Sequence, residues 1–76
     1  MEEVKQFSER LILLRKQYGL TQKQLAEKLG ITERTYQRLE SGTSLPSYKT
    51  INSIIAFFGQ GPADYLLGQS DALTRQ

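Results

Sequence analysis

Residues 21–42 read TQKQLAEKLGITERTYQRLESG, and this stretch predicts two short helices joined by a tight turn. Thr21 followed three residues later by Gln24 is a capping box, in which each side chain bonds the backbone N–H of the other residue, so a helix begins here. Gly30 ends that helix, because glycine adopts the left-handed backbone conformation without steric cost. Thr32 then supplies the hydroxyl cap of a second helix.

The second helix, over residues 32–41, has two chemically different sides. Successive residues on a helix lie about 100° apart around its axis, so Tyr36, Leu39 and Glu40 fall on one side, which we expect to face the protein. The opposite and flanking positions carry the polar residues Glu33, Arg34, Thr35, Gln37, Arg38 and Ser41. Arginine, amide and hydroxyl groups suit DNA base edges and phosphates. An ordinary solvated helix face has the same composition, but the capped helix and glycine turn before it favour the DNA-binding interpretation.

This stretch contains a characteristic series of residue types in a fixed order. They are Gln22, Leu25, Ala26, Leu29, Gly30, Ile31, Thr32, Thr35, Tyr36, Leu39, Glu40 and Gly42. Leu14-Arg15-Lys16 and Gly19-Leu20 precede them, and Pro46-Ser47 follows. In these positions the chain resembles the helix-turn-helix of the phage repressor/Cro-type family, also called the XRE family. The resemblance implies an all-α, compact, lambda-repressor-like bundle of five short helices, in which helices 2 and 3 form the helix-turn-helix.

The other three helices are predicted from apolar periodicity and breakers. The first, over residues 3–18, has an apolar stripe made of Val4, Phe7, Leu11, Leu14 and Tyr18. The fourth, over residues 47–58, has an apolar face made of Tyr48, Ile51, Ile54, Ile55 and Phe58. Pro62 at the first helical position opens a short fifth helix, which Gly68 ends. We therefore expect one domain over residues 1–68 and a polar, disordered tail over residues 69–76.

Composition argues against catalysis and metal binding. The 76 residues include no cysteine and no histidine, which removes disulfides, the commonest general base and the commonest metal ligand. The eight carboxylates are scattered, so we expect no active site, metal or cofactor, and no small-molecule ligand in so small a core. A net charge of +2 fits a nucleic-acid partner and an ordinary soluble domain equally well. The sequence has no apolar run of membrane length and no signal peptide. The resemblance implies that the compartment is a bacterial or phage cytoplasm.

Two opposite charges stand on inward faces. Arg15 falls inside the apolar stripe of the first helix, and Glu40 falls on the inward side of the third. Charges isolated on inward faces should pair with each other. In the family that the chain resembles, an arginine and a glutamate at the matching positions form a structural ion pair. We therefore predict a partly buried Arg15–Glu40 pair that joins the two helices and does not touch DNA.

The resemblance also implies roles on DNA. Helix 32–41 would enter the major groove, and a homodimer, formed in solution or only on DNA, would bind a near-palindromic operator as a repressor. Arg34 and Arg38 are the best candidates for base readout, since arginine bonds guanine through two parallel hydrogen bonds. Glu33 and Thr35 are weaker candidates. The DNA backbone would be contacted by Gln22, Gln37, Ser41, Thr43, Ser44 and Lys49.

Several apolar residues leave a second function open. Ile12, Leu13 and Phe57 stand where the resembled family has polar or small residues. They are either scattered surface residues or a contact with the tail, a second subunit or another protein. The alternative function is accordingly a protein-interaction module, antitoxin-like or anti-regulator. Tyr65 and Leu66 are candidates for a dimer interface, with core packing as the competing interpretation for Leu66.

Overall fold

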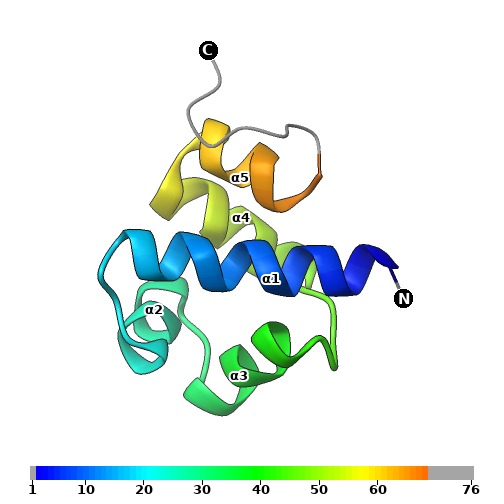
Figure 1. Cartoon of the computed structure of the whole chain (residues 1–76). Coiled ribbons are helices and arrows are strands. Elements are labelled where there is room, and N and C mark those ends of the chain that lie inside the picture. Colours follow the sequence, from blue (N-terminus) through cyan, green and yellow to red (C-terminus); the bar gives the residue numbers. More distant parts are fainter. Residues whose placement is uncertain (1, 69–76) are drawn as a thin grey trace.

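The computed structural model describes residues 2–68, and all of its regular structure in that range is helical, as the sequence predicts (Figure 1). The five helices are α1 (Glu2–Gln17), α2 (Gln22–Leu29), α3 (Glu33–Ser41), α4 (Tyr48–Phe58) and α5 (Gln60–Leu66). The tail predicted over residues 69–76 lies outside the described residues.

The long helix α1 crosses the molecule, with α2 and α3 below it and α4 and α5 above it in Figure 1. It packs against α3 on one side and α5 on the other, while α2 packs against α3 and α4, and α4 against α5. Each helix therefore buries one face. The core is made of Phe7, Leu11, Leu14, Leu25, Ala26, Leu29, Tyr36, Leu39, Ile54, Phe58, Ala63 and Leu66.

Two tyrosines expected in the core are exposed instead. Tyr48 is 80% exposed, because the buried face of α4 is centred on Thr50, Ile54 and Phe58, and a residue six positions before Ile54 lies about 120° away around the helix. Tyr18 is 45% exposed because it follows the end of α1. Its ring still packs edge-on against Phe58, with the centroids 4.9 Å apart.

The start of α5 also differs from the prediction. The helix begins at Gln60 and not at Pro62. Proline is compatible with this position because the N–H groups of the first turn have no intrahelical partner. Gly59, with a φ of 94°, separates α5 from α4. The side-chain amide of Gln60 donates to Asp64 at 2.8 Å, which supports the first turn of α5.

Candidate nucleic-acid interface

The α2–turn–α3 unit is built from the local signals in its sequence. Thr21 and Gln24 form the predicted capping box, with side-chain to backbone distances of 3.0 and 2.9 Å. Gly30 leaves α2 at a φ of 73°, in the left-handed region that favours glycine. The hydroxyl of Thr32 accepts from the backbone N–H of Thr35 at 3.1 Å and so caps α3. These local bonds fix where α3 begins relative to α2.

Helix α3 has the two sides that its sequence predicts. Tyr36, Leu39 and Glu40 are buried. The six polar residues on the other positions are all exposed, namely Glu33, Arg34, Thr35, Gln37, Arg38 and Ser41. Within the described residues, neither Arg34 nor Arg38 has an ion-pair partner. Two guanidinium groups one turn apart are therefore available to an external acceptor.

A buried polar network supports α3 from behind. Arg15 Nε donates to Glu40 Oε2 at 2.5 Å, and the two side chains are 14% and 6% exposed. A second Arg15 nitrogen donates to the backbone oxygen of Leu20 at 2.9 Å. The Tyr36 hydroxyl donates to Glu40 Oε2, and Gln22 Nε2 donates to Glu40 Oε1 at 2.9 Å. The carboxylate thus joins α1, α2 and α3 at one point.

The network shifts the acid–base properties of its members. Burial raises the pKa of Glu40, but hydrogen bonds from Arg15, Tyr36 and Gln22 together outweigh burial, and the net pKa lies below the ordinary value. The hydrogen bond to Glu40 is the largest effect on Arg15 and raises its pKa. Burial and the bond to Glu40 raise the pKa of the Tyr36 phenol. Glu40 is therefore a carboxylate and Tyr36 a neutral donor near neutral pH.

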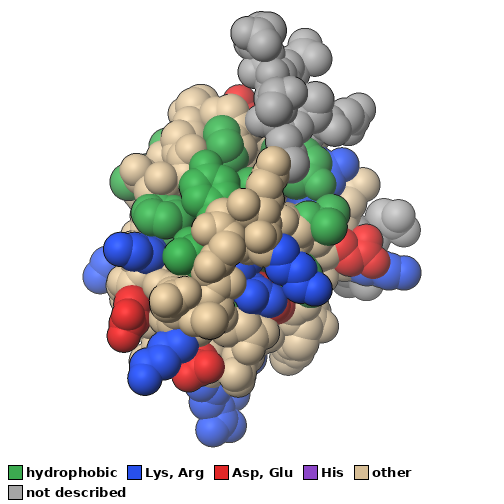
Figure 2. Space-filling model, turned by 60° about the vertical axis from the view of Figure 1, so that its left-hand side comes forward, with side chains coloured by type: hydrophobic (Ala, Val, Ile, Leu, Met, Phe, Trp, Pro, Cys, Tyr) green, Lys and Arg blue, Asp and Glu red, His purple; other side chains and the backbone are tan. Residues whose placement is uncertain are grey.

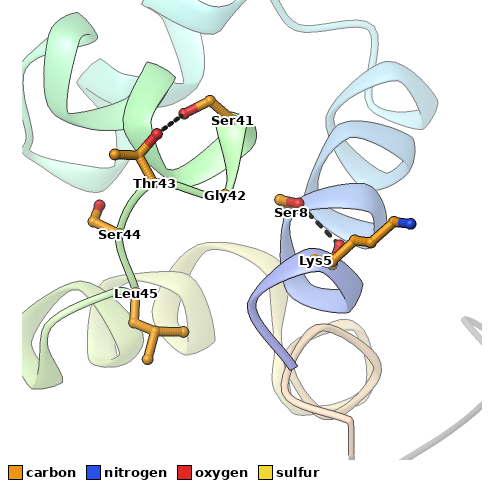
Figure 3. A pocket seen from close by; sticks show the side chains of 7 residues that line it. All are labelled: Lys5, Ser8, Ser41, Gly42, Thr43, Ser44 and Leu45. Carbon is orange, nitrogen blue, oxygen red and sulfur yellow. Dashed lines mark hydrogen bonds between the residues drawn. The ribbon is translucent and has the colours of Figure 1, made fainter. Parts of the chain in front are cut away.

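The loop after α3 presents hydroxyl groups. The backbone N–H groups of Thr43 and Ser44 both donate to the carbonyl oxygen of Arg38, at 3.0 and 3.4 Å. The hydroxyls of Ser41 and Thr43 lie 2.6 Å apart. This loop and the residues Lys5 and Ser8 of α1 line a shallow hollow (Figure 3). The exposed Lys49 lies in the first turn of α4, just beyond the loop.

The residues predicted to form a partner surface have different environments. Leu13 is 57% exposed, and Ile12 is half-buried. Phe57 is half-buried and packs against the core, with its ring centroid 4.9 Å from that of Phe58. Figure 2 shows hydrophobic side chains gathered on the upper half of one face, with charged side chains mostly below them. Of the three, Leu13 is the residue whose side chain is mainly available to a partner.

The two residues of α5 predicted to form a dimer interface also have different environments. Leu66 is 2% exposed and belongs to the core, which favours the competing interpretation of core packing for this residue. Tyr65 is half-buried. Its carbonyl oxygen accepts from Arg10 at 2.7 Å, and the Arg10 guanidinium lies 4.7 Å from the centroid of its ring. Tyr65 therefore helps to hold α5 against α1.

Sequence reasoning missed two donors to Glu40. Tyr36 lies four residues before Glu40 on the same side of α3, and that spacing brings two side chains together. The sequence analysis predicted only that Tyr36 faces the protein, although a buried phenol usually finds a hydrogen-bond partner. Gln22 was predicted only to contact the DNA backbone. Its bond to Glu40 joins residues 18 positions apart in sequence and has no local signal.

Two searches of the described residues gave negative findings. No group of three or more histidine, cysteine or acidic residues in residues 2–68 is arranged to hold a metal ion. In the same range, no helix is both long enough and apolar enough to cross a membrane.

Comparisons with known proteins agree with this geometry. The sequence model of the family described as helix-turn-helix matches residues 11–66. The chain is 46% identical over 66 residues to the uncharacterized HTH-type transcriptional regulator YqaE of Bacillus subtilis (strain 168), covering 86% of this chain and 56% of that protein. It is 37% identical over 54 residues to an uncharacterized HTH-type transcriptional regulator of Methanocaldococcus jannaschii, covering 71% of this chain and 82% of that protein. The chain thus spans just over half the length of the Bacillus relative. No solved structure gave a significant match.

Proposed function

The chain belongs to the phage repressor/Cro-type (XRE) family of helix-turn-helix domains, and we propose that it is a sequence-specific DNA-binding transcriptional regulator. It binds a near-palindromic operator as a homodimer and represses transcription, with α3 in the major groove. The observation that carries this proposal is the outer side of α3, where Arg34 and Arg38 are exposed and lack an ion-pair partner among the described residues. The proposed function is binding, not catalysis, and it needs no cofactor.

The residues proposed to read the bases lie on the outer side of α3. Arg34 and Arg38 each reach guanine O6 and N7, and each such pair is worth about 1–3 kcal/mol of discrimination. Glu33 accepts from a cytosine amino group. The hydroxyl of Thr35 is engaged by Thr32 at 2.9 Å, which leaves its methyl group to contact a thymine methyl.

Backbone contacts surround the reading helix. Lys49 and the hydroxyls of Thr43 and Ser44 lie beyond its C-terminal end, while Gln22 lies at the start of α2. Ser41 and Gln37 belong to the outer side of α3 itself. Contacts of this kind set the register of the protein on the duplex but carry little sequence information.

The small size of the domain is the reason for proposing a dimer. A single small module buries too little surface for tight specific binding, and two copies on half-sites about one helical turn apart would supply the rest. The half-buried Tyr65 on α5 is the remaining interface candidate of the pair. We place the dimer in the cytoplasm, where its DNA target would lie.

Selection from a random DNA duplex library tests this function. We expect a two-fold symmetric motif, in which the Arg34→Ala and Arg38→Ala variants each relax the preference for a particular guanine. Binding without any motif, and only at low salt, would show that the fold is not used to read sequence.

The exposed Leu13, at 57%, favours a second candidate function, a protein-interaction module. The same selection separates the two, because a module of that kind would give no DNA motif. The self-association of the chain is a further test.

A further inference from the structure

Gln22 connects the buried network to the outer side of α3. Its side-chain nitrogen donates inward to Glu40 Oε1 at 2.9 Å. Its side-chain oxygen accepts from Gln37 Nε2 on the other side, at 3.4 Å. Glu40 is buried, Gln22 is half-buried and Gln37 is exposed. Three side chains therefore lead in a row from the core to the surface that we assign to DNA.

The direction of both hydrogen bonds follows from the carboxylate. Glu40 can only accept, and its Oε2 already takes the bonds from Arg15 and Tyr36. The group of Gln22 that meets Oε1 must therefore be its NH2, which turns its carbonyl oxygen outward. Gln37 must meet that oxygen with its own NH2. Neither amide can flip without placing two acceptors or two donors face to face.

This arrangement fixes what Gln37 offers to a ligand. One N–H is held by Gln22, and among residues 2–68 the carbonyl oxygen and the second N–H have no partner, so both can bond an external ligand. Gln37 also lines a shallow surface hollow together with Glu33 and Arg34, the two residues at the start of the reading helix. It thus lies beside proposed base readers and not with the phosphate-contacting loop.

We propose that Gln37 reads an adenine in the major groove, and that Gln22 and Glu40 are positioning residues that hold its amide in the required orientation. Adenine presents an acceptor at N7 and a donor at N6, which a glutamine amide matches with one N–H and its oxygen. Guanine presents two acceptors, O6 and N7. The oxygen of an amide that cannot flip would then face an acceptor, so guanine is rejected. This inference rests on the proposed function and moves Gln37 from backbone contact to base readout.

The test is the same DNA selection, carried out with the full chain and three further variants. The wild type should prefer adenine about tenfold or more over guanine at one position of each half-site. Gln37→Ala should abolish that preference and leave the guanines assigned to Arg34 and Arg38. Gln37→Glu can only accept and would face the outward oxygen of Gln22 acceptor to acceptor, so it should also lose the adenine preference. Gln22→Met keeps the length of the side chain but bonds neither neighbour, and it should lower the adenine preference several-fold.

The positioning role of Gln22 must be tested by a quantity that a general loss of DNA affinity does not change. Gln22→Met is expected to weaken binding to all sequences, because Gln22 is also proposed to contact phosphate. The decisive quantity is therefore the ratio of affinities for the adenine and guanine forms of the same site. Gln17→Ala, an exposed glutamine at the end of α1, is the matched control and should leave this ratio unchanged.

The outcomes separate this inference from the proposed function. A clear motif in which no base preference changes with Gln37→Ala would overturn the adenine assignment and leave the regulator standing. An adenine preference that Gln37 carries but that Gln22→Met does not lower would overturn the positioning role. The absence of any motif would overturn the proposed function and the assignment of Gln37 with it.

Discussion

Arg15 of α1 and Glu40 of α3 form an ion pair at 2.5 Å, with side chains 14% and 6% exposed. Glu40 lies on the inner side of the helix whose outer side carries Arg34 and Arg38. Because Tyr36 and Gln22 bond the same carboxylate, the pair sets the orientation of the outer side relative to the rest of the domain. The interaction is structural, yet it determines where the proposed DNA-reading groups point.

Breaking this pair on one side should destabilise the fold strongly. Arg15→Met leaves Glu40 as a buried carboxylate without its cation, and the expected loss is about 3 kcal/mol in the free energy of unfolding. The double variant Arg15→Met, Glu40→Leu should lose less than the sum of the two single variants, because neither charge is then left unpaired. Urea unfolding followed by circular dichroism measures all three. Strictly additive losses would mean that the two side chains are not energetically coupled.

The same carboxylate should make stability depend on acid pH. The folded-state pKa of Glu40 lies below its ordinary value of 4.5, so its contribution is complete above that value and is lost as the pH falls through the folded-state pKa. We expect the free energy of unfolding to fall more steeply below about pH 4.5 in the wild type than in Glu40→Gln. Glu27→Gln, an exposed carboxylate of α2, controls for the change in net charge. If the free energy of unfolding falls equally with decreasing pH in the wild type and in Glu40→Gln, the lowered pKa of Glu40 is contradicted.

Alanine should destabilise the protein both at Gly30 and at Gly61, for different reasons. Gly30 has a φ of 73°, and an added Cβ would meet nothing within 4 Å, so its cost is conformational and should be about 1 kcal/mol. Gly61 lies in the first turn of α5 without a positive φ, directly before Pro62. A Cβ on the residue before a proline clashes with the proline ring in the helical conformation, so Gly61→Ala should lower the stability and lose the usual helical advantage of alanine over glycine. Thermal unfolding of both variants measures the two losses, and a gain of stability in Gly61→Ala would mean that residue 61 does not have a helical backbone.

Local rules predicted the parts of the fold that local bonds build. The capping box of Thr21 and Gln24 and the turn at Gly30 depend on residues within a few positions of each other. The burial of Tyr36 and Glu40 on one side of α3 follows from the helical repeat alone. The DNA contacts of the outer side stay predictions, because they depend on a partner and not on the chain.

The predictions were wrong where tertiary packing decides which face of a helix is buried or at which residue a helix begins. The predicted face of α4 included Tyr48 because apolar residues were counted together, whereas packing centres the buried face on Thr50 and Ile54. The start of α5 was placed at Pro62 because proline favours the first helical position. The bond between Gln22 and Glu40 joins two helices. No periodicity within one helix can show such a bond.

Leu13 tests whether the apolar surface is used for association. It is 57% exposed on the outer side of α1, where a leucine gains little from the fold. If it forms a contact between copies or with a partner, Leu13→Lys should reduce self-association measured by light scattering across a concentration series. Lys16→Ala, also exposed on α1, is the matched control. Unchanged association and solubility in Leu13→Lys would remove the support for the protein-interaction function.

Lys49 and Arg38 should affect DNA binding in different ways, because one is proposed to contact phosphate and the other a base. Lys49→Ala should weaken binding to all sequences alike and reduce the slope of log affinity against log salt by about 1, since one fewer counterion is released. Arg38→Ala should instead lower discrimination at one guanine by about 1–3 kcal/mol.

Titrations of the selected site and of a copy with that guanine replaced, at several salt concentrations, separate these effects. Lys28→Ala removes a charge of the same sign from the exposed end of α2 and is the control for general electrostatics. A smaller change with Lys28→Ala than with Lys49→Ala would locate the phosphate contact near the start of α4. If Lys49→Ala changes specificity and leaves the salt slope intact, the two roles are assigned to the wrong residues, and the duplex lies closer to α4 than we propose.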